Sequence, residues 1–392
     1  MRLWCLPLLI LALGGGLNEG SSALERLAAK PSPKCDRTLS AGANVAKAIR
    51  HAPGKATICL RGGTYSTIEL GNLEKAKPIT VRAVKGAKAR VDGIELEAVS
   101  GLRFVGLRLT EGISVTPVGS RLAFLDNRIT GHLGIYMFGD YRIGDRISHV
   151  VIEGNRIHDI DYSGAQEPGF GYGIAGLGDV RHVLVARNTI QSTASDYLQS
   201  ASPVDWTVEG NTFLGPSLLG SHEDHQDLWQ IFGGGTDITF ADNVARDTET
   251  QESLLFQEGH FGHVVVRNNL FDHDSLGYTC QIYQSSGLVF RRNTIVGSRW
   301  GCLFRDLASA PPGGGYNVER NIFVKTHEGP GIATEGRAGS WGTYAHNVSD
   351  DGSARGPGSI RHWHPRWYNR WTFRPRGLPY AAGYSGSGGA KP

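Results

Sequence analysis

Three stretches decide the fold: VARNTI at 185–190, VEGNTF at 208–213 and FADN at 240–243. Each places an asparagine after a short run that contains β-branched or aromatic residues. The pattern recurs in both directions along the chain, at intervals of 23 to 33 residues. The asparagines of this series are Asn127, Asn155, Asn188, Asn211, Asn243, Asn269, Asn293, Asn321 and Asn347. Self-similarity at such a period is typical of a repeat protein.

The asparagine series predicts stacked coils of short strands. One repeat of about 20–45 residues cannot bury an apolar face alone, so neighbouring coils must cover each other. An asparagine at the same bend of each coil can bond both the turn backbone and the next asparagine. We therefore expect an all-β solenoid, a parallel β-helix with an asparagine ladder. The longer intervals must hold loops, at 132–148, 159–179 and 216–226.

The two ends of the chain differ from the repeat. An apolar run at 3–17, with Arg2 before it and small residues at 21–23, is typical of a secretory signal peptide. Residues 41–51 have a helical pattern, and a helix there would cover the open N-terminal end of a solenoid. We expect a signal peptide at 1–23, an N-terminal cap region at 24–60, the parallel β-helix at 61–350, and a C-terminal cap and tail at 351–392, with a loose tail from Gly383 onward.

Composition restricts the partners. The net charge is only +3 and no run of Lys and Arg is present, so nucleic acid is not an expected partner. After the leader, no stretch of about 18 apolar residues could span a membrane. With 40% hydrophobic and 20% charged residues, the chain can form a core. We expect a secreted monomer, extracellular or at the cell surface.

Four cysteines follow the leader: Cys35, Cys59, Cys280 and Cys302. An exported protein can form disulfides. The local pairing is Cys35–Cys59 and Cys280–Cys302, and sequence alone leaves the other two pairings open. Cys280 and Cys302 take the inward phase one coil apart, within bridging distance on adjacent strands. We therefore predict the Cys280–Cys302 disulfide.

The segment before the ladder resembles a known family. RGGTYSTIEL (61–70), PITVRAV (78–84) and VDGIEL (91–96) resemble the first coils of pectate-lyase-like β-helix proteins, and the asparagine ladder resembles the same superfamily. The resemblance implies a right-handed parallel β-helix that handles an extracellular carbohydrate. Members include polysaccharide lyases, hydrolases, epimerases and adhesive proteins, so the fold does not decide the reaction.

A second pattern lies upstream of the ladder. Four glutamines precede the next ladder asparagine by 12 or 13 residues, which predicts that they stack on one strand. Alternation turns them outward, and amides with Arg suit sugar hydroxyls and carboxylates. An amide ladder that only stabilises the stack is the alternative. The predicted outward set is Gln199, Gln230, Gln257, Gln281, Tyr197, Tyr283 and Arg305. The predicted inward set is Leu198, Trp229, Phe256 and Ile282.

The densest polar cluster is SHEDHQDLWQ at 221–230. Its His225-x-Asp227-x-x-Gln230 segment resembles one found in many bacterial proteins of this superfamily. The coils before and after place carboxylates at the same offset, so one patch gathers a histidine, carboxylates and amides. A hydrogen-bonded network that braces the loop from Pro216 is the structural alternative. The predicted catalytic residues are His225, Asp227, Asp196, Glu252 and Arg305.

These residues suit a carbohydrate-active enzyme with a polysaccharide substrate, and we expect a polysaccharide lyase. In β-elimination a base, here His225, removes the proton next to a uronate carboxyl while Arg305 holds that carboxyl. A calcium ion near Asp224 and Asp227 is an optional cofactor, as in many lyases of the superfamily. The alternatives are a glycoside hydrolase with paired carboxylates and a glycan-binding or adhesive surface protein without activity. Should a stable His225→Ala protein keep full activity, the site is expected in the loop that holds Asp159, Asp161 and Glu167.

Overall fold

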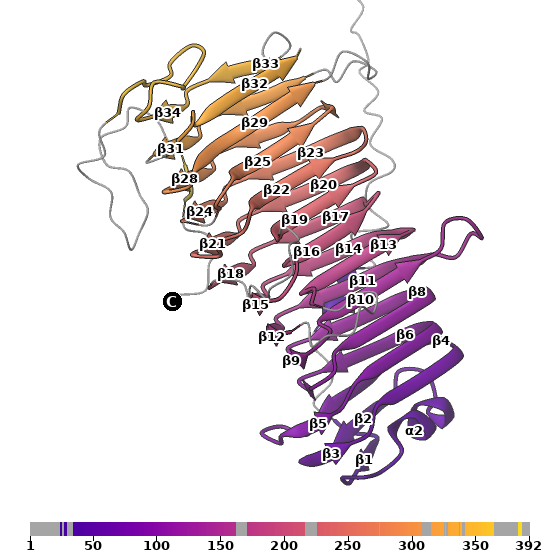
Figure 1. Ribbon diagram of the computed structural model, residues 1–392. Coiled ribbons are helices and arrows are strands. Elements are labelled where there is room, and N and C mark those ends of the chain that lie inside the picture. Colours follow the sequence, from indigo (N-terminus) through magenta and orange to yellow (C-terminus); the bar gives the residue numbers. More distant parts are fainter. Residues whose placement is uncertain are drawn as a thin grey trace, which may run out of the picture.

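The chain folds as a right-handed parallel β-helix, seen in a computed structural model (Figure 1). The structure describes residues 24–25, 27–29, 34–161, 171–215, 226–273, 275–306, 315–324, 326, 328–336, 338, 342–363 and 383–385. Its strands stack coil upon coil from β1 at one end to β33 at the other. Among the predicted site residues, Asp224 and His225 lie outside the described residues, as does Glu167.

Three strands of each complete coil form three parallel faces of the solenoid. Face 1 comprises β10 (Ile135–Gly139), β13 (Ile174–Gly178), β16 (Leu198–Ala201), β19 (Asp227–Phe232), β22 (Glu252–Gln257), β25 (Tyr278–Tyr283), β29 (Trp300–Asp306) and β32 (Ile332–Gly336). Face 2 comprises β1 (Arg37–Leu39), β2 (Thr57–Leu60), β11 (Ile147–Glu153), β14 (Val180–Ala186), β17 (Val204–Glu209), β20 (Gly235–Ala241), β23 (Phe261–Arg267), β26 (Ser285–Ser286), β27 (Val289–Arg291), β30 (Tyr316–Glu319) and β33 (Gly342–Ala345).

Three long strands run through faces 1 and 2 without a break, which joins both faces into one sheet. They are β4 (Ile68–Ala83), β6 (Ile94–Val105) and β8 (Ile113–Leu125). Face 3 is a separate sheet of β3 (Gly63–Tyr65), β5 (Ala89–Val91), β7 (Arg108–Leu109), β9 (Arg128–Gly131), β12 (Arg156–Ile160), β15 (Thr189–Thr193), β18 (Thr212–Leu214), β21 (Val244–Arg246), β24 (Leu270–Asp272), β28 (Thr294–Val296), β31 (Ile322–Val324) and β34 (Val348–Ser349).

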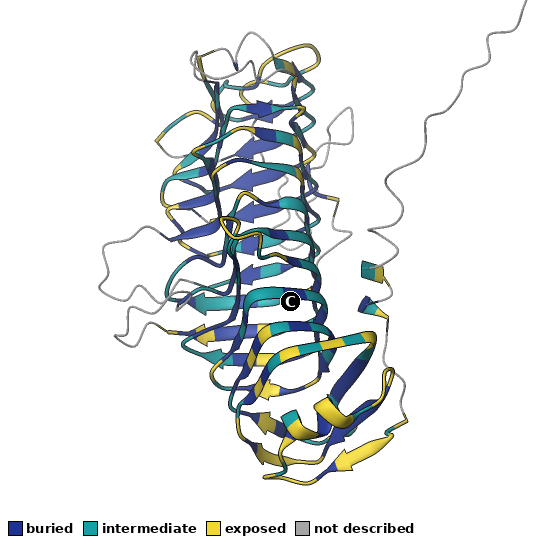
Figure 2. Ribbon diagram, turned by 90° about the vertical axis from the view of Figure 1, so that its right-hand side faces the viewer, coloured by how far each residue is buried: buried dark blue, intermediate teal, exposed yellow. Residues whose placement is uncertain are grey.

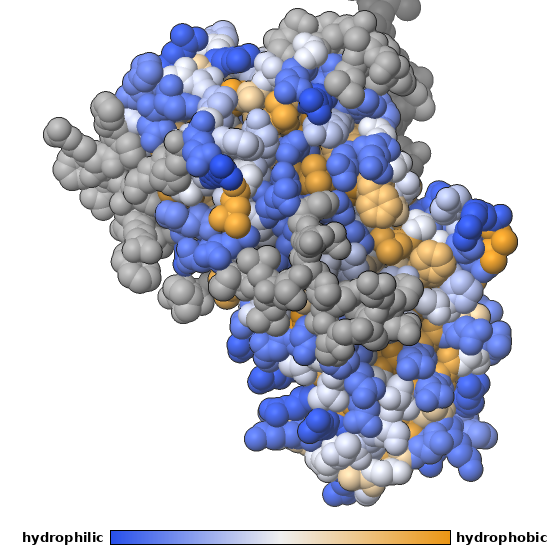
Figure 3. Space-filling model, in the orientation of Figure 1, coloured by the Kyte–Doolittle hydropathy of each residue, from blue (hydrophilic) through white to orange (hydrophobic). Residues whose placement is uncertain are grey.

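The inward side chains of the three faces fill one continuous core, because alternate residues of a strand point to opposite sides. Leu198, Trp229, Phe256 and Ile282 are all buried, as predicted. The ring of Phe240 on face 2 stacks against two phenylalanine rings of face 3. Figure 2 shows that the stacked strands consist largely of buried and intermediate residues, and the face seen in Figure 3 is mainly hydrophilic with scattered hydrophobic patches.

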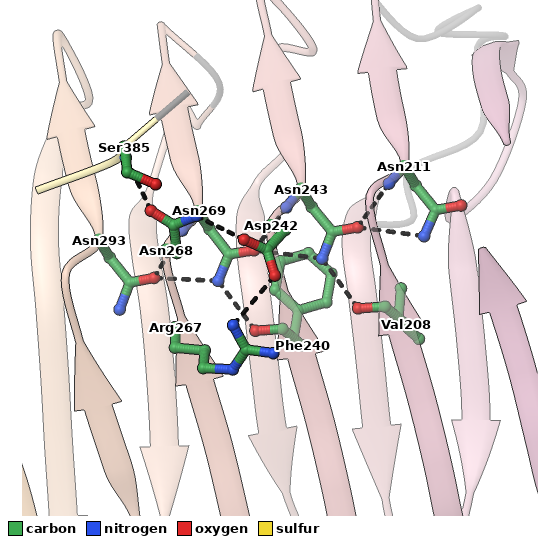
Figure 4. A network of polar contacts seen from close by, with 10 residues as sticks. All are labelled: Val208, Asn211, Phe240, Asp242, Asn243, Arg267, Asn268, Asn269, Asn293 and Ser385. Carbon is green, nitrogen blue, oxygen red and sulfur yellow. Dashed lines mark hydrogen bonds and ion pairs between the residues drawn. The ribbon is translucent and has the colours of Figure 1, made fainter. Parts of the chain in front are cut away.

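The predicted asparagine ladder is confirmed over all nine positions. The backbone N–H and the Nδ2 of each asparagine from Asn127 to Asn321 both donate to Oδ1 of the next, as from Asn211 to Asn243 at 2.9 and 3.1 Å (Figure 4). Nδ2 also donates to a backbone carbonyl of the preceding coil, such as Val208 O from Asn243 at 3.0 Å. The residue before each asparagine has a positive φ, for example 54° at Arg187 and 62° at Gly210. This left-handed residue turns the chain from face 2 to face 3.

The N-terminal end carries the helix expected at 41–51, as α2 (Val45–His51). It begins at the N-cap Asn44, whose side chain accepts from the Lys47 N–H at 2.7 Å. Val45, Ala48 and Ile49 are buried, and α2 lies beside β4 at the end of the solenoid (Figure 1). Both local disulfides are present, Cys35–Cys59 and Cys280–Cys302, with Cα–Cα distances of 5.7 and 4.5 Å.

The prediction of a loose tail from Gly383 is wrong for residues 383–385. The Tyr384 N–H donates to Thr294 Oγ1 at 2.9 Å, and the Ser385 N–H donates to Asn268 Oδ1 at 2.7 Å. The Tyr384 side chain is buried against Leu270. These hydrogen bonds hold the segment against coils whose residues lie 90 and 117 positions earlier in the sequence.

Candidate functional site

Face 1 carries a column of outward residues along β16, β19, β22, β25 and β29. Gln199 is in register with Gln230, and Gln199 Nε2 donates to Gln230 Oε1 at 2.8 Å. Leu255, not Gln257, continues the column, and Gln281 follows it. The predicted stack of four glutamines is therefore wrong at Gln257, which is in register with Phe232. The bend between faces 1 and 2 varies in length, so the distance to the ladder asparagine does not fix the register.

The predicted carboxylates do lie together, at the start of successive face 1 strands. The Asp227 N–H donates to Asp196 Oδ1 at 2.7 Å, and the Glu252 N–H donates to Asp227 Oδ1 at 3.0 Å. All three side chains are buried, and Asp227 is 0% exposed. Asp196 Oδ2 also accepts from Gln199 Nε2 at 3.2 Å. This ladder of carboxylates fixes the starts of the strands on which the glutamines lie.

A chain of polar contacts crosses face 1 from Glu252 to Arg305. Gln281 Nε2 donates to Glu252 Oε1 at 2.9 Å, and the Tyr283 hydroxyl donates to Gln281 Oε1 at 2.7 Å. Arg305 Nη1 donates to Tyr283 Oη at 3.4 Å, and its guanidinium lies 5.2 Å from the Tyr283 ring centre. Arg305 also forms an ion pair with Glu335.

The polar surroundings hold Arg305 in its charged form. Burial alone would lower the pKa of its guanidinium, but the hydrogen bond with Glu335 and the proximity of Tyr283 outweigh burial and raise that pKa. Both Tyr283 and Arg305 are partly exposed, so a ligand on face 1 can reach them. The sequence prediction that both face outward is confirmed.

Two aromatic residues beside this chain were not predicted. Tyr278 is in register with Trp300, and their rings lie 4.7 Å apart with a 48° tilt. Both are partly exposed. The Arg299 guanidinium lies 5.3 Å from the Trp300 ring centre. Burial and the nearby Glu335 raise the pKa of Tyr278. Neither residue belongs to a repeating spacing, and only their shared position two residues before Cys280 and Cys302 could have identified them.

Tyr197 does not face outward, and that prediction is wrong. Its side chain is buried, and its hydroxyl donates to Gly215 O at 2.6 Å. Burial raises the pKa of this phenol strongly. Tyr197 precedes the first residue of β16, so strand alternation does not apply to it.

The part of the chain that the structure describes contains neither a metal-binding group nor a membrane-spanning helix. Within the described residues, no group of three or more His, Cys, Asp or Glu side chains is arranged to hold a metal ion. The calcium prediction rests partly on Asp224, which lies outside those residues. No helix in the described parts of the chain is long and apolar enough to cross a membrane.

Solved structures with the same architecture identify the fold. A variant of the alginate lyase AlyGC, of polysaccharide lyase family PL6, matches 90% of this chain and 57% of its own, with a TM-score of 0.52 and 13% identity. The surface adhesin PfbA of Streptococcus pneumoniae matches 78% of this chain and 79% of its own, with a TM-score of 0.51 and 10% identity. The chain has the fold of the pectate-lyase-like β-helix proteins.

Another β-helix neighbour has a third kind of activity. The GH136 lacto-N-biosidase of Eubacterium ramulus matches 86% of this chain and 69% of its own, with a TM-score of 0.50 and 12% identity. The sequence matches no protein-family model and no curated protein. At these identities the likeness shows the fold, and its owners include a lyase, an adhesin and a hydrolase.

Proposed function

We propose that this protein is a secreted polysaccharide lyase that acts on a uronate-containing glycan along face 1, between β16 and β29. The observation that carries the proposal is the hydrogen bond from Arg305 to Tyr283. It is the last of a series of side-chain hydrogen bonds that begins at Glu252. A guanidinium and a phenol lie side by side where a sugar can reach both.

β-Elimination needs a group that holds the uronate carboxyl and a base for the neighbouring C–H proton. The base takes the proton, the electron pair of that C–H bond forms a new C=C bond, and the C–O bond to the leaving sugar breaks. Its electron pair stays on the leaving oxygen, which takes up a proton to become a hydroxyl. Arg305 suits the first role, because a guanidinium binds a carboxylate through two parallel hydrogen bonds. Tyr283 suits proton transfer, because its hydroxyl lies beside that guanidinium. His225, which lies outside the described residues, remains the base that the sequence proposes.

The remaining face 1 residues have supporting roles in this proposal. Gln199, Gln230 and Gln281 offer amides to sugar hydroxyls. Tyr278 and Trp300 offer aromatic surface for packing against a sugar ring. The carboxylates of the strand starts act as positioning residues, because they accept backbone N–H groups of the strands that carry the amides.

A polysaccharide panel tests the reaction. The purified protein is incubated with uronate-containing and neutral polysaccharides, and both the absorbance of unsaturated uronate and the number of reducing ends are followed. We expect new absorbance with at least one uronate polymer. Reducing ends without that absorbance would replace the lyase by a hydrolase. Binding without any product would favour the adhesive alternative.

Variants of the two central residues test the site. Tyr283→Phe should lower kcat by about 10²–10⁴-fold if the phenol transfers the proton. Arg305→Lys should mainly raise KM, because it keeps the charge but loses the two-pronged bond. Arg291→Ala, at an exposed position on face 2, is the matched control. Should Tyr283→Phe retain full activity while His225→Ala loses it, the base is His225.

A further inference from the structure

Face 3 carries a row of arginines on four successive coils. Arg90 of β5 is in register with Arg108 of β7. Arg128 of β9 is in register with Arg108 on one side and with Arg156 of β12 on the other. Neighbouring strands of a sheet lie about 4.8 Å apart, so the row is roughly 14 Å long. We call these four residues the arginine row, and β5, β9 and β12 follow one another along one side of the solenoid (Figure 1).

The arginine row is exposed, and its charge is not neutralised within the chain. All four side chains are exposed, and the residue that follows each arginine is buried in the core. None of the four forms a hydrogen bond or an ion pair with any residue that the structure describes. The residues two positions before the four arginines are Lys88, Gly106, Asp126 and Gly154. One carboxylate therefore stands there beside five cations.

The fold does not require arginine at this position of the coil. The next strands of face 3 have Thr189, Thr212 and Val244 in the same register. Like charges directly opposite each other on neighbouring strands repel and destabilise a sheet. The arginine row is thus unfavourable for the isolated chain, and an anionic ligand that lies along it would relieve the repulsion.

The geometry of the row selects the kind of anion. A guanidinium binds a carboxylate through two parallel hydrogen bonds. Four guanidinium groups in line fit a ligand that repeats its charge along an extended chain. A single-stranded nucleic acid would use aromatic side chains on which its bases stack. The strands β5, β7, β9 and β12 contain no Phe, Tyr or Trp.

We infer that the arginine row binds an acidic polysaccharide whose sugars carry carboxylates. Thr130, which lies two positions after Arg128 on β9 and is partly exposed, offers a hydroxyl to the sugars beside the row. The row is a second binding surface, because it lies on face 3 whereas Tyr283 and Arg305 lie on face 1. It holds the polymer without acting on it, and so it goes beyond the proposed lyase site.

Calorimetry tests the charge of the ligand. The background is the variant Arg305→Ala, in which face 1 loses its proposed carboxylate partner. The probes are an oligomer of galacturonate and its fully methyl-esterified form, of equal length and longer than the row. The free acid should bind at least about tenfold more tightly than the ester, and more weakly as salt rises. Equal affinity for both probes, or no binding of the free acid, would overturn the inference.

Two further probes separate the polysaccharide from other polyanions. A single-stranded oligonucleotide and anionic phospholipid vesicles should both bind more weakly than the galacturonate oligomer. Tighter binding of either one would overturn the inference and assign the row to that partner. Binding is measured without turnover, so these outcomes are independent of the proposed lyase reaction.

Variants locate the binding on the row. The double variant Arg108→Gln and Arg128→Gln should weaken binding of the galacturonate oligomer at least about tenfold and flatten its salt dependence. Its melting temperature should be equal or higher, because the repulsion between neighbouring arginines is reduced. The matched control is the double variant Arg291→Gln and Arg292→Gln, which removes the same charge from exposed positions elsewhere and should not change the affinity. Unchanged affinity in the row variant, or an equal loss in the control, would overturn the inference.

Discussion

At the scale of single residues, strand alternation holds inside a strand and fails at its edges. Gln199, the second residue of β16, lies opposite in phase to the buried Leu198, as the sequence predicts. Tyr197 lies one position before β16, and its side chain turns into the core. Alternation counted back through a bend therefore predicts the wrong face for Tyr197, whereas Tyr283, the last residue of β25, is predicted correctly.

This difference predicts opposite effects for two matching substitutions. Tyr197→Phe removes the bond to Gly215 O and should destabilise the fold by about 1 kcal/mol, with unchanged turnover per folded protein. Tyr283→Phe should leave the melting temperature unchanged and lower turnover. Thermal unfolding and activity are measured on the same samples. Loss of turnover in a stable Tyr197→Phe protein would contradict the assignment of Tyr197 to the core.

A histidine pair predicts acid sensitivity. The His149 and His182 rings stack with centroids 4.8 Å apart. Burial, then the neighbouring His182, lowers the pKa of His149 below 6.5, against the opposing effect of Asp205 and with a smaller contribution from Arg121. The unfolded chain therefore binds this proton more tightly than the folded one. Stability is complete above pH 6.5 and falls as the pH drops from 6.5 through the folded-state pKa.

His149→Asn should remove this part of the acid sensitivity, since Asn tolerates the positive φ of 55° at that position. Melting temperatures are recorded across the acid range. The wild type should lose more stability between neutral and acid pH than His149→Asn does. His263→Asn, an exposed position on face 2, is the control and should behave as the wild type does. An identical slope for all three proteins would exclude His149 as the source.

At the scale of elements, repeated features are predictable and single features are not. The asparagine ladder is visible in the sequence because the same residue must occupy the same bend of every coil. The register of face 1 cannot be predicted from the sequence in the same way, because the bends after β19 and β22 differ in length. Leu255 therefore takes the place expected for Gln257. Tyr278 and Trp300 come from two single coils, and only their position two residues before a cysteine marks them in the sequence.

An interior rung of the ladder should be costly to remove. In Asn243→Ala, the Asn211 N–H and Nδ2 lose their acceptor and Val208 O loses its donor. Each buried polar group left without a partner costs about 1–3 kcal/mol, so we expect a loss of roughly 3 kcal/mol or more. Asn317→Ala is the control, because the buried Oδ1 of that side chain has no hydrogen-bond partner among the described residues. Chemical denaturation gives both values, and equal stability of the two variants would show that the ladder contributes little.

At the scale of the whole molecule, the described coils form a one-dimensional stack that carries one disulfide near its N-terminal end and a second between two later coils. Each coil contacts mainly the coils before and after it, so stability is close to a sum of local terms. The Cys35–Cys59 bridge and α2 lie at the N-terminal end, and the Cys280–Cys302 bridge joins β25 to β29. The sequence predicts both disulfides, because the position of each cysteine in its coil and the expected export of the protein can be inferred from simple sequence patterns. The reaction is not predictable from it, because one fold serves lyases, hydrolases and adhesins.

This layout predicts that each disulfide protects its own end. The double variant Cys280→Ala and Cys302→Ala opens a loop of 22 residues, which should cost about 3 kcal/mol. Because coils couple to their neighbours, the loss should be concentrated around β25, β29 and β32 and fade toward β4 and β6. Hydrogen exchange followed by mass spectrometry should show faster exchange in the first group and little change in the second. The Cys35→Ala and Cys59→Ala double variant should reverse that pattern. A uniform acceleration along the chain in either variant would mean that the solenoid unfolds as one cooperative unit, and the nearest-neighbour description would then be wrong for this protein.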